Sequence, residues 1–268
     1  MPASPPIGRV LIIAGSDSGG GAGIQADIKA ITALGAYAAT AITAVTVQNT
    51  LGVFGVHPVP LDVIEAQARA VLDDIGADVI KTGMLGDAGA VELSARLIGD
   101  AAVPAVIDPV MVAKGGEPLL AEAAVAAVRS ALVPQSALLT PNAPEAEALT
   151  GLPVRSLDDQ RRAGEVLLRQ GARAVLMKGG HLPGERVIDL LLTPEGETLF
   201  EGPRIDTRHT HGTGCTLASA CAAGMAQGLP LTEAVARAWA YTAEAIRRAP
   251  GLGRGHGPLD HGWPMRRT

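Results

Sequence analysis

Short apolar runs alternate with amphipathic stretches along most of the chain. The run RVLIIAG is apolar, short and ended by glycine, which is typical of a buried strand. The stretch LDVIEAQARAVLDDIG has the spacing of a helix with one buried face. The pattern predicts strands over residues 9–15, 37–48, 77–83, 103–111, 136–142 and 172–180. It predicts intervening helices over residues 21–35, 61–76, 87–100, 119–133, 143–151 and 158–171.

The pattern changes after residue 180. Residues 185–193 and 196–202 predict a short antiparallel β pair, followed by two helices over about 212–228 and 231–248. Alternating strands and helices with uninterrupted apolar strands indicate an α/β fold, with helices on both faces of the sheet. We find no linker, repeat or low-complexity stretch, so we expect residues 1–268 to form one domain.

The longest uncharged run extends from residue 30 to residue 61. It contains glycines, prolines and the polar pair Gln48 and Asn49, which argues against a membrane span. We interpret this run as the end of a helix, then a buried strand, then a loop.

Polar and glycine residues follow each predicted parallel strand. They are Gly15, Ser16, Asp17, Gln48, Asn49, Thr82, Gly83, Met84, Asp108, Pro109, Asn142, Glu145, Lys178, Gly179 and Gly180. Any one set could be an ordinary turn, because Gly, Asp and Asn are common after strands. The carboxyl edge of an open parallel sheet forms its ligand crevice, however, and the repetition at every strand favours one shared site.

The composition narrows the possible partners. The chain of 268 residues is 47% apolar, enough for one sizeable core, and its net charge is −5 without a block of like charges. This charge argues against a nucleic acid or an anionic membrane as partner, and 2% aromatic residues offer little for base stacking. Two cysteines without metal-binding spacing, and an N-terminus without an apolar signal region, predict a reducing, cytoplasmic location.

The glycine loop GSDSGGGAGIQA matches the dinucleotide pattern G-x-G-x-x-A at Gly21, Gly23 and Ala26. That fingerprint also requires an acidic residue about twenty positions later, at the end of the next strand. The next strand, AITAVTVQN, has no acid, which argues against NAD. The remaining interpretations are a ligand loop and a flexible turn packed closely on its neighbours.

The segment HGTGCT, residues 211–216, can bind an anion although no P-loop motif is present. Backbone N–H groups of Gly212, Thr213 and Gly214, at the start of a helix, would converge on a phosphate. A helix cap by Thr210 or Thr213 is the alternative, but two glycines around a threonine exceed what capping needs.

Cys215 lies in the first turn of the same predicted helix. A helix N-terminus lowers the pKa of a thiol, whereas a phosphoryl group nearby opposes that effect. A role as a small apolar filler therefore stays open for Cys215, and it is the role expected for Cys221.

Three charged residues complete the candidate site. Carboxylates beside phosphates commonly hold Mg²⁺, which makes Asp108 and Glu145 candidate ligands. Lys178 ends an apolar strand and precedes two glycines, so it is placed to neutralise phosphate charge. Each could instead be an ordinary surface residue.

Taken together, these motifs resemble the ribokinase-like superfamily and, within it, the bacterial hydroxymethylpyrimidine/phosphomethylpyrimidine kinases of thiamine biosynthesis. The resemblance covers nearly the whole chain and is carried by IAGSDSGGGAGIQADIKA, AVTVQNT, KTGMLGD, DPVMVAKGG, TPNAPEAEALTG, VLMKGGH, THGTGCTLASA and GHGPLDH. It implies a three-layer αβα fold around a mostly parallel sheet. It also implies phosphorylation of 4-amino-5-hydroxymethyl-2-methylpyrimidine and then of its monophosphate with ATP and Mg²⁺, by a homodimer.

The resemblance also assigns roles to single residues. Gln48 would hydrogen-bond the aminopyrimidine, in a pocket lined by Gly15, Asp27, Met84 and Val110. Asn142 and Glu145 match the family's N-x-x-E magnesium motif, Asp108 lies near metal and phosphates, and Lys178 contacts ATP phosphate. The anion hole is Gly212, Thr213 and Gly214, and Cys215 takes the place of the aspartate base found in most ribokinase-like enzymes.

Two alternatives remain beside this resemblance. Ser18 and Gly19 replace a Pro-Ser pair that many relatives carry, so a pyridoxine or pyridoxal kinase stays open. A non-catalytic pyrimidine-binding regulator is the other, and the intact set of charged residues argues against it. Residues 112–120 are the candidate flap, because glycines flank their polar centre.

Overall fold

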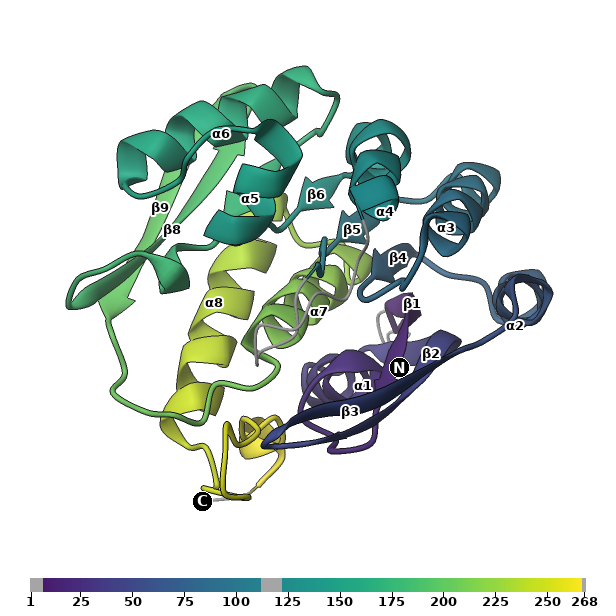
Figure 1. Cartoon of the computed structure of the whole chain (residues 1–268), viewed down its shortest axis with the longest axis horizontal. Helices are drawn as coiled ribbons and strands as arrows, with labels where there is room; N and C mark the ends of the chain where they lie inside the picture. Colours follow the sequence, from purple (N-terminus) through teal and green to yellow (C-terminus); the bar gives the residue numbers. More distant parts are fainter. Residues whose placement is uncertain (1–6, 112–121, 267–268) are drawn as a thin grey trace, which may run out of the picture.

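A computed structural model describes residues 7–111 and 122–266, and in these residues all strands join one nine-stranded sheet (Figure 1). Its strand order is β3-β2-β1-β4-β5-β6-β7-β8-β9. The strands are β1 (Arg9–Asp17), β2 (Tyr37–Asn49), β3 (Gly52–Pro58), β4 (Val79–Thr82), β5 (Ala105–Ile107), β6 (Leu138–Leu139), β7 (Val175–Met177), β8 (Arg186–Thr193) and β9 (Gly196–Pro203). Pairing is parallel from β2 to β7 and antiparallel at β2–β3, β7–β8 and β8–β9.

The helices cover both faces of this sheet (Figure 1). They are α1 (Gly23–Ala33), α2 (Leu61–Asp74), α3 (Ala88–Ala101), α4 (Glu122–Ala127), α5 (Ala143–Thr150), α6 (Leu157–Arg169), α7 (Thr213–Ala226) and α8 (Leu231–Arg247). The three-layer α/β fold and the antiparallel β8–β9 pair are therefore confirmed. No helix in the described ranges is long and apolar enough to cross a membrane.

Strand β1 shows how the sequence produces these layers. Leu11 and Ile13 point into the core under α2, α3, α5 and α6, whereas Val10 and Ile12 point into the core under α1, α7 and α8. Successive side chains of a strand point to opposite faces, so a strand buried on both faces must be apolar throughout. Cys221 lies fully buried in the second core, which confirms its expected role as filler.

The expectation of a loop after residue 49 is wrong. Residues 52–58 form β3, which pairs antiparallel with β2, for example Val45 with His57. This strand is an edge strand with two glycines and a proline, and Phe54 on it is 66% exposed. Its sequence therefore lacks the uninterrupted apolar run by which the other strands were recognised.

The central strands β5 and β6 are shorter than predicted, with three and two residues. The chain leaves the sheet directly before Asp108, so the polar residues beyond each strand lie at its edge. Helix α4 continues as a π-helical turn over Val128–Leu132, and the start of the predicted helix 119–133 lies outside the described residues. The candidate flap, residues 112–120, also lies outside them.

Candidate active site

A cleft of about 750 Å³ runs along the carboxyl edge of the sheet. Its volume lies in the range of small-molecule and cofactor sites. The cleft brings together all but one of the site residues predicted from the sequence, namely Gly15, Gln48, Met84, Asp108, Val110, Asn142, Glu145, Lys178, Gly212, Thr213, Gly214 and Cys215. These residues come from segments spread over the whole chain, which the parallel strand order brings to one edge.

One wall of the cleft is the glycine loop that connects β1 to α1. The buried carboxylate of Asp17 accepts hydrogen bonds from the backbone N–H groups of Gly19, Gly21 and Ala22, at 2.7, 3.0 and 2.8 Å. Burial raises the pKa of Asp17, but His211 and these backbone donors outweigh it and leave that pKa below its usual value. The loop is therefore held around an ionised carboxylate and is not a flexible turn.

Gln48 lies beside this loop, at the end of β2. The ring of His211 joins the two, because its Nε2 atom is 2.9 Å from Asp17 Oδ2 and 3.2 Å from the amide nitrogen of Gln48. Thr46 Oγ1 donates to the carbonyl oxygen of Ser16 and lies 3.1 Å from Gln48 Oε1. Each end of the Gln48 amide therefore has a polar neighbour at the cleft surface.

Gly15 and Met84 lie against each other at the floor of the same half of the cleft. The Gly15 N–H group donates to the Met84 carbonyl at 3.0 Å, and a Cβ atom at Gly15 would overlap the Met84 methyl group. A side chain at position 15 would therefore require the flexible end of Met84 to move.

Asp27 is the predicted residue that does not line the cleft. It is fully buried on α1, where its carboxylate accepts from Lys81 Nζ at 2.9 and 3.0 Å and from Ser219 Oγ at 2.7 Å. Lys81 is also fully buried, on β4, yet it lines the cleft. Burial lowers the pKa of Lys81, but Asp27, Cys215 and Asp108 together outweigh it and raise that pKa, which keeps the ammonium charged. Asp27 therefore reaches the cleft through Lys81.

Lys178 extends over the middle of the cleft between two carboxylates. Its Nζ atom is 2.9 Å from Asp108 Oδ1 and 3.6 Å from Glu145 Oε2. Burial lowers the pKa of Lys178, and the two carboxylates outweigh that effect and raise it. Burial also raises the pKa of Glu145 to about 7, against the opposing charge of Lys178. The cation and its carboxylates form one coupled charge set.

Asn142 and Glu145 begin α5 with a reciprocal capping box. The Asn142 side chain accepts from the Glu145 N–H at 2.9 Å, and Glu145 Oε2 accepts from the Asn142 N–H at 2.8 Å. This pairing fixes the position of Glu145 beside Lys178. The N-x-x-E spacing therefore caps α5, in addition to the magnesium binding that the sequence predicts.

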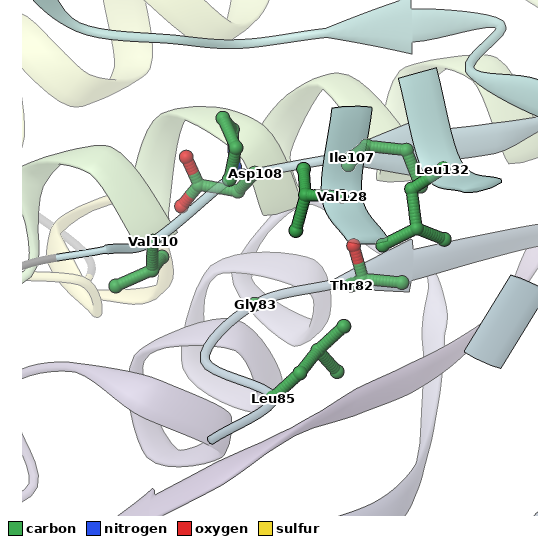
Figure 2. A pocket seen from close by; sticks show the side chains of 9 residues that line it. Thr82, Gly83, Leu85, Ile107, Asp108, Val110, Val128 and Leu132 are labelled. Atoms are coloured by element: carbon green, nitrogen blue, oxygen red, sulfur yellow. The ribbon is translucent and has the colours of Figure 1, made fainter. Parts of the chain in front are cut away.

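The donor set at Asp108 fits a magnesium ion. Figure 2 shows Asp108 and Val110 beside a small apolar pocket, with the carboxylate of Asp108 pointing away from Val128 and Leu132. Thr140 and Lys178 donate to its Oδ1, whereas its buried Oδ2 has no hydrogen-bond partner. Among the described residues no three His, Cys, Asp or Glu side chains form a ready metal cage. Mg²⁺ characteristically binds to one or two carboxylates together with water and substrate phosphates, and this arrangement offers such a set.

The predicted anion hole opens directly beneath Lys178. Gly212 is the N-cap of α7, with a left-handed φ of 83° and no side-chain cap. A Cβ atom on Gly214 would lie 3.2 Å from Lys178 Nζ and 3.8 Å from Asp108 Oδ2. The first amides of a helix have no helical acceptor and carry partial positive charge, and this helix start faces the charge set. The Thr213 N–H group donates back to the Thr210 carbonyl at 3.3 Å. Neither Thr210 nor Thr213 caps α7, since Thr213 Oγ1 donates to the Thr210 carbonyl instead.

Cys215 lies in the first turn of α7 and lines the cleft. Burial raises the pKa of its thiol to about 12; Lys81 lowers it and Asp27 raises it. Burial therefore outweighs the lowering effect of the helix N-terminus, and the thiol is protonated at neutral pH. Ser219 lies one helical turn further along the same face of α7, where it donates to Asp27.

The other half of the cleft lies between β8, β9 and α8. Its lining includes His181, Val187, Asp189, Gly202, Arg204, Trp239, Thr242 and Arg247. Asp189 accepts from the Gly179 N–H at 2.7 Å, and burial raises its pKa to about 6. This contact fixes the turn that follows Lys178.

The sequence did not predict several of the residues and contacts that build the site. Lys81 carries the one available signal, a lysine inside an otherwise apolar strand. Asp17 and His211 lie 194 positions apart, and no local pattern predicts their contact. Asp189 and Trp239 lie in segments for which the sequence predicts a strand and a helix but no site residue.

A bare helix start, a cation held by carboxylates and a two-part cleft define a small-molecule kinase in which phosphate is handled by positioning and charge. The comparisons agree with this class. The family model described as phosphomethylpyrimidine kinase matches residues 17–260. The chain is 49% identical to the hydroxymethylpyrimidine/phosphomethylpyrimidine kinase of Streptomyces coelicolor, over 98% of this chain and 97% of that protein.

Two solved structures extend the comparison. The ADP complex of Bacillus subtilis pyridoxal kinase superposes with a TM-score of 0.90 at 37% identity, covering 96% of this chain and 98% of that one. Phosphomethylpyrimidine kinase from Clostridium difficile superposes with a TM-score of 0.80 at 40% identity, covering 90% and 100%. The chain belongs to the phosphomethylpyrimidine kinase family.

The geometry at Gly212 generates a first prediction. In the Gly212→Ala variant a Cβ atom would overlap the carbonyl oxygen of Gly21, in addition to the left-handed strain of about 1–2 kcal/mol. We expect the two glycine loops to separate and kcat/KM to fall by about 10²-fold, the size of effect that a small misplacement produces. Steady-state kinetics and thermal unfolding measure both effects.

Gly228→Ala is the matched control for this variant. Gly228 has a similar φ of 80°, but a Cβ atom there would meet nothing within 4 Å. We expect a stability loss of about 1–2 kcal/mol with unchanged kinetics. Equal kinetics for the two variants would contradict the role given to the Gly212–Gly21 contact.

Proposed function

We propose that this chain phosphorylates 4-amino-5-hydroxymethyl-2-methylpyrimidine and then its monophosphate with ATP, in thiamine biosynthesis. The observation that carries the proposal is the single cleft, in which Gln48 and the phosphate-handling set around Lys178 meet at one sheet edge. Membership of the phosphomethylpyrimidine kinase family supports the substrate. We propose that residues 1–268 act as one kinase domain.

The pyrimidine would bind at the Gln48 end of the cleft. A side-chain amide offers both a donor and an acceptor, which complements the ring nitrogen and exocyclic amine of an aminopyrimidine. Met84 and Val110 provide apolar contacts for the ring and its methyl group, and both line this part of the cleft. Asp27 would act indirectly, by neutralising Lys81 beneath the substrate.

ATP would occupy the half of the cleft between β8, β9 and α8. Lys178 would contact the transferred phosphate, and the amides of Gly212, Thr213 and Gly214 would receive its oxygens. The hydroxymethyl oxygen attacks the γ-phosphorus, the bond to the β–γ bridging oxygen breaks, and ADP leaves. The ADP complex of the related pyridoxal kinase supports nucleotide binding by this fold. We propose a cytoplasmic location, because ATP would be the phosphate donor and both cysteines carry free thiols, as is usual in a reducing compartment.

We propose that Asp108 and Glu145 hold Mg²⁺, with the unpartnered Oδ2 of Asp108 as the first candidate ligand. When bound, the ion neutralises charge that develops on the phosphate oxygens. Asn142 contributes by holding Glu145 in place through the capping box.

Cys215 would assist or orient the attacking hydroxyl. Its protonated thiol can accept a hydrogen bond weakly and fixes the space beside the helix start, whereas base catalysis requires the thiolate. Phosphoryl transfer gains most from positioning and charge stabilisation, so a modest contribution from proton removal is sufficient.

A substrate panel tests the proposed function. ADP release is measured with ATP and Mg²⁺ on hydroxymethylpyrimidine, its monophosphate, pyridoxal and ribose, and phosphorus NMR identifies the product. We expect turnover of both pyrimidines, ending in a diphosphate, and loss of turnover when EDTA removes Mg²⁺. Binding of the pyrimidine without turnover of any substrate would contradict the kinase and favour the regulator.

The structural similarity to pyridoxal kinases supports a second candidate function, the phosphorylation of pyridoxal. The Bacillus subtilis pyridoxal kinase superposes with a higher TM-score than the phosphomethylpyrimidine kinase structure, 0.90 against 0.80. Turnover of pyridoxal alone in the same panel would retain the phosphate chemistry and replace the pyrimidine substrate.

Variants of Cys215 test its proposed role. We expect Cys215→Ala to lower kcat by less than about 10²-fold, because the protonated thiol only assists or orients the hydroxyl, whereas loss of a general base would cost about 10²–10⁴-fold. Cys215→Asp restores a base and separates proton removal from packing. Cys221→Ala is the control, since it removes a thiol from the core and not from the cleft. Near-normal turnover of Cys215→Ala would contradict the base role.

We propose that the enzyme is a homodimer joined through the β2–β3 end of the sheet. Exposed apolar side chains gather there, with exposed fractions of 41–66% for Val45, Val47, Leu51, Phe54 and Val56. An exposed apolar surface on an edge strand is costly in a monomer. Light scattering should give twice the chain mass, and Phe54→Asp should halve it; a monomeric wild-type protein would contradict this interface.

A further inference from the structure

The glycine-rich segment Gly253–His261, here named the C-terminal clasp, crosses the Gln48 half of the active site. It follows α8 and contains neither helix nor strand apart from one isolated β-bridge. Nothing in the proposed mechanism gives these residues a role. Their contacts fall on three separate segments, each of which ends in the cleft.

The first contact is with the turn between β2 and β3. The His256 N–H group donates to the Thr50 carbonyl at 2.8 Å, and the Gly255 N–H group donates to Thr50 Oγ1 at 3.3 Å. A Cβ atom at Gly253 would overlap the Thr50 side chain, and one at Gly255 would overlap the Thr50 carbonyl oxygen. The close fit therefore requires glycine at both positions. Thr50 lies two residues after Gln48.

The second contact is with the segment that leads into the anion hole. The His211 N–H group donates to the Gly257 carbonyl at 3.1 Å, and His211 forms a parallel β-bridge with Pro258. His256 Nδ1 lies 3.0 Å from the Arg208 carbonyl oxygen. His211 immediately precedes Gly212, so the clasp holds the backbone at the start of the anion hole.

The third contact is with α7. His261 Nε2 is 2.9 Å from Thr216 Oγ1, and the Tyr241 hydroxyl group donates to the His261 carbonyl at 2.7 Å. Thr216 follows Cys215 in the first turn of the helix. The clasp thus ties the helix start, the approach to it and the Gln48 turn to one segment of chain.

We propose that the C-terminal clasp is a positioning element that sets the distance between Gln48 and the anion hole at Gly212–Gly214. This distance decides how the substrate alcohol is presented to the transferred phosphate. The inference rests on the proposed placement of the pyrimidine at Gln48. The contact with Thr50 lies beside Gln48, whereas the contacts with α8 are made at the other end of the clasp, by Asp260 and His261. A change at the Thr50 contact should therefore act on the alcohol substrate and leave nucleotide affinity unchanged.

The test compares a glycine of the clasp with one that lies two residues before it. Gly253→Ala introduces a Cβ atom against Thr50, with φ at +81°. Gly251→Ala has a similar φ of +72°, but its nearest neighbour would be His209 Nε2 at 3.8 Å. We expect Gly253→Ala to raise the KM for hydroxymethylpyrimidine by about tenfold or more, because a misplaced binding group costs up to about 10²-fold. Gly251→Ala should leave that KM unchanged, and calorimetry should give the wild-type Kd for ADP with both variants.

A double variant shows whether the contact itself is responsible. Thr50→Gly removes the three atoms that a Cβ at Gly253 would meet most closely. Thr50→Gly/Gly253→Ala should therefore return the KM close to that of Thr50→Gly alone. If Gly253→Ala yields no folded protein, His256→Ala tests the clasp through its second contact, because it removes the ring contact with Arg208 without a new clash. We then expect a smaller rise in KM, with the ADP affinity again unchanged.

Two results would overturn the proposal: an equal pyrimidine KM for Gly253→Ala and Gly251→Ala, or a joint loss of pyrimidine and ADP affinity, which indicates general destabilisation. For His256→Ala, an unchanged KM has the same meaning. If the wild-type protein phosphorylates pyridoxal instead, the proposed substrate has failed before any variant is made. The same comparison then uses the KM for pyridoxal.

Discussion

The carboxylate of Asp17 joins the two glycine loops on which the active site depends. It accepts three backbone N–H groups from the loop after β1 and lies 2.9 Å from the His211 ring, next to the anion hole. Gly212 completes the junction, because its backbone approaches Gly21 too closely for any side chain. The Gln48 end and the Gly212–Gly214 end of the cleft are therefore held relative to each other before any ligand binds.

Charge in the site is balanced by buried pairs, which makes it sensitive to single substitutions. Lys81 with Asp27, and Lys178 with Asp108 and Glu145, place two cations and three carboxylates at or beneath the cleft. Removing one partner of such a pair typically costs about 3–5 kcal/mol, because the other charge stays buried. An incoming polyphosphate and its metal ion would enter a site that already contains oriented charges of both signs. The charged side chains then need to move little while the phosphoryl group is transferred.

Much of the fold could be predicted because strands buried on both faces must be apolar throughout, as β1 shows. The edge strand β3 was not predicted, because burial does not constrain its sequence and Phe54 on it is largely exposed. The site was predictable where residues follow strands, as Asp108, Asn142 and Lys178 do. Asp27 was expected in the pocket lining, whereas the structure places it behind Lys81. Their contact spans 54 positions and leaves no local pattern.

The sequence alone determined the strand–helix alternation, the sheet edge that carries the site and the family, because apolar periodicity and glycine motifs are local properties. The tertiary structure alone decided which charges pair, that burial keeps the Cys215 thiol protonated, and that Gly253 and Gly255 pack on Thr50. These features depend on desolvation and on contacts between residues distant in the sequence. Such contacts exist only after the parallel strands have brought their ends together.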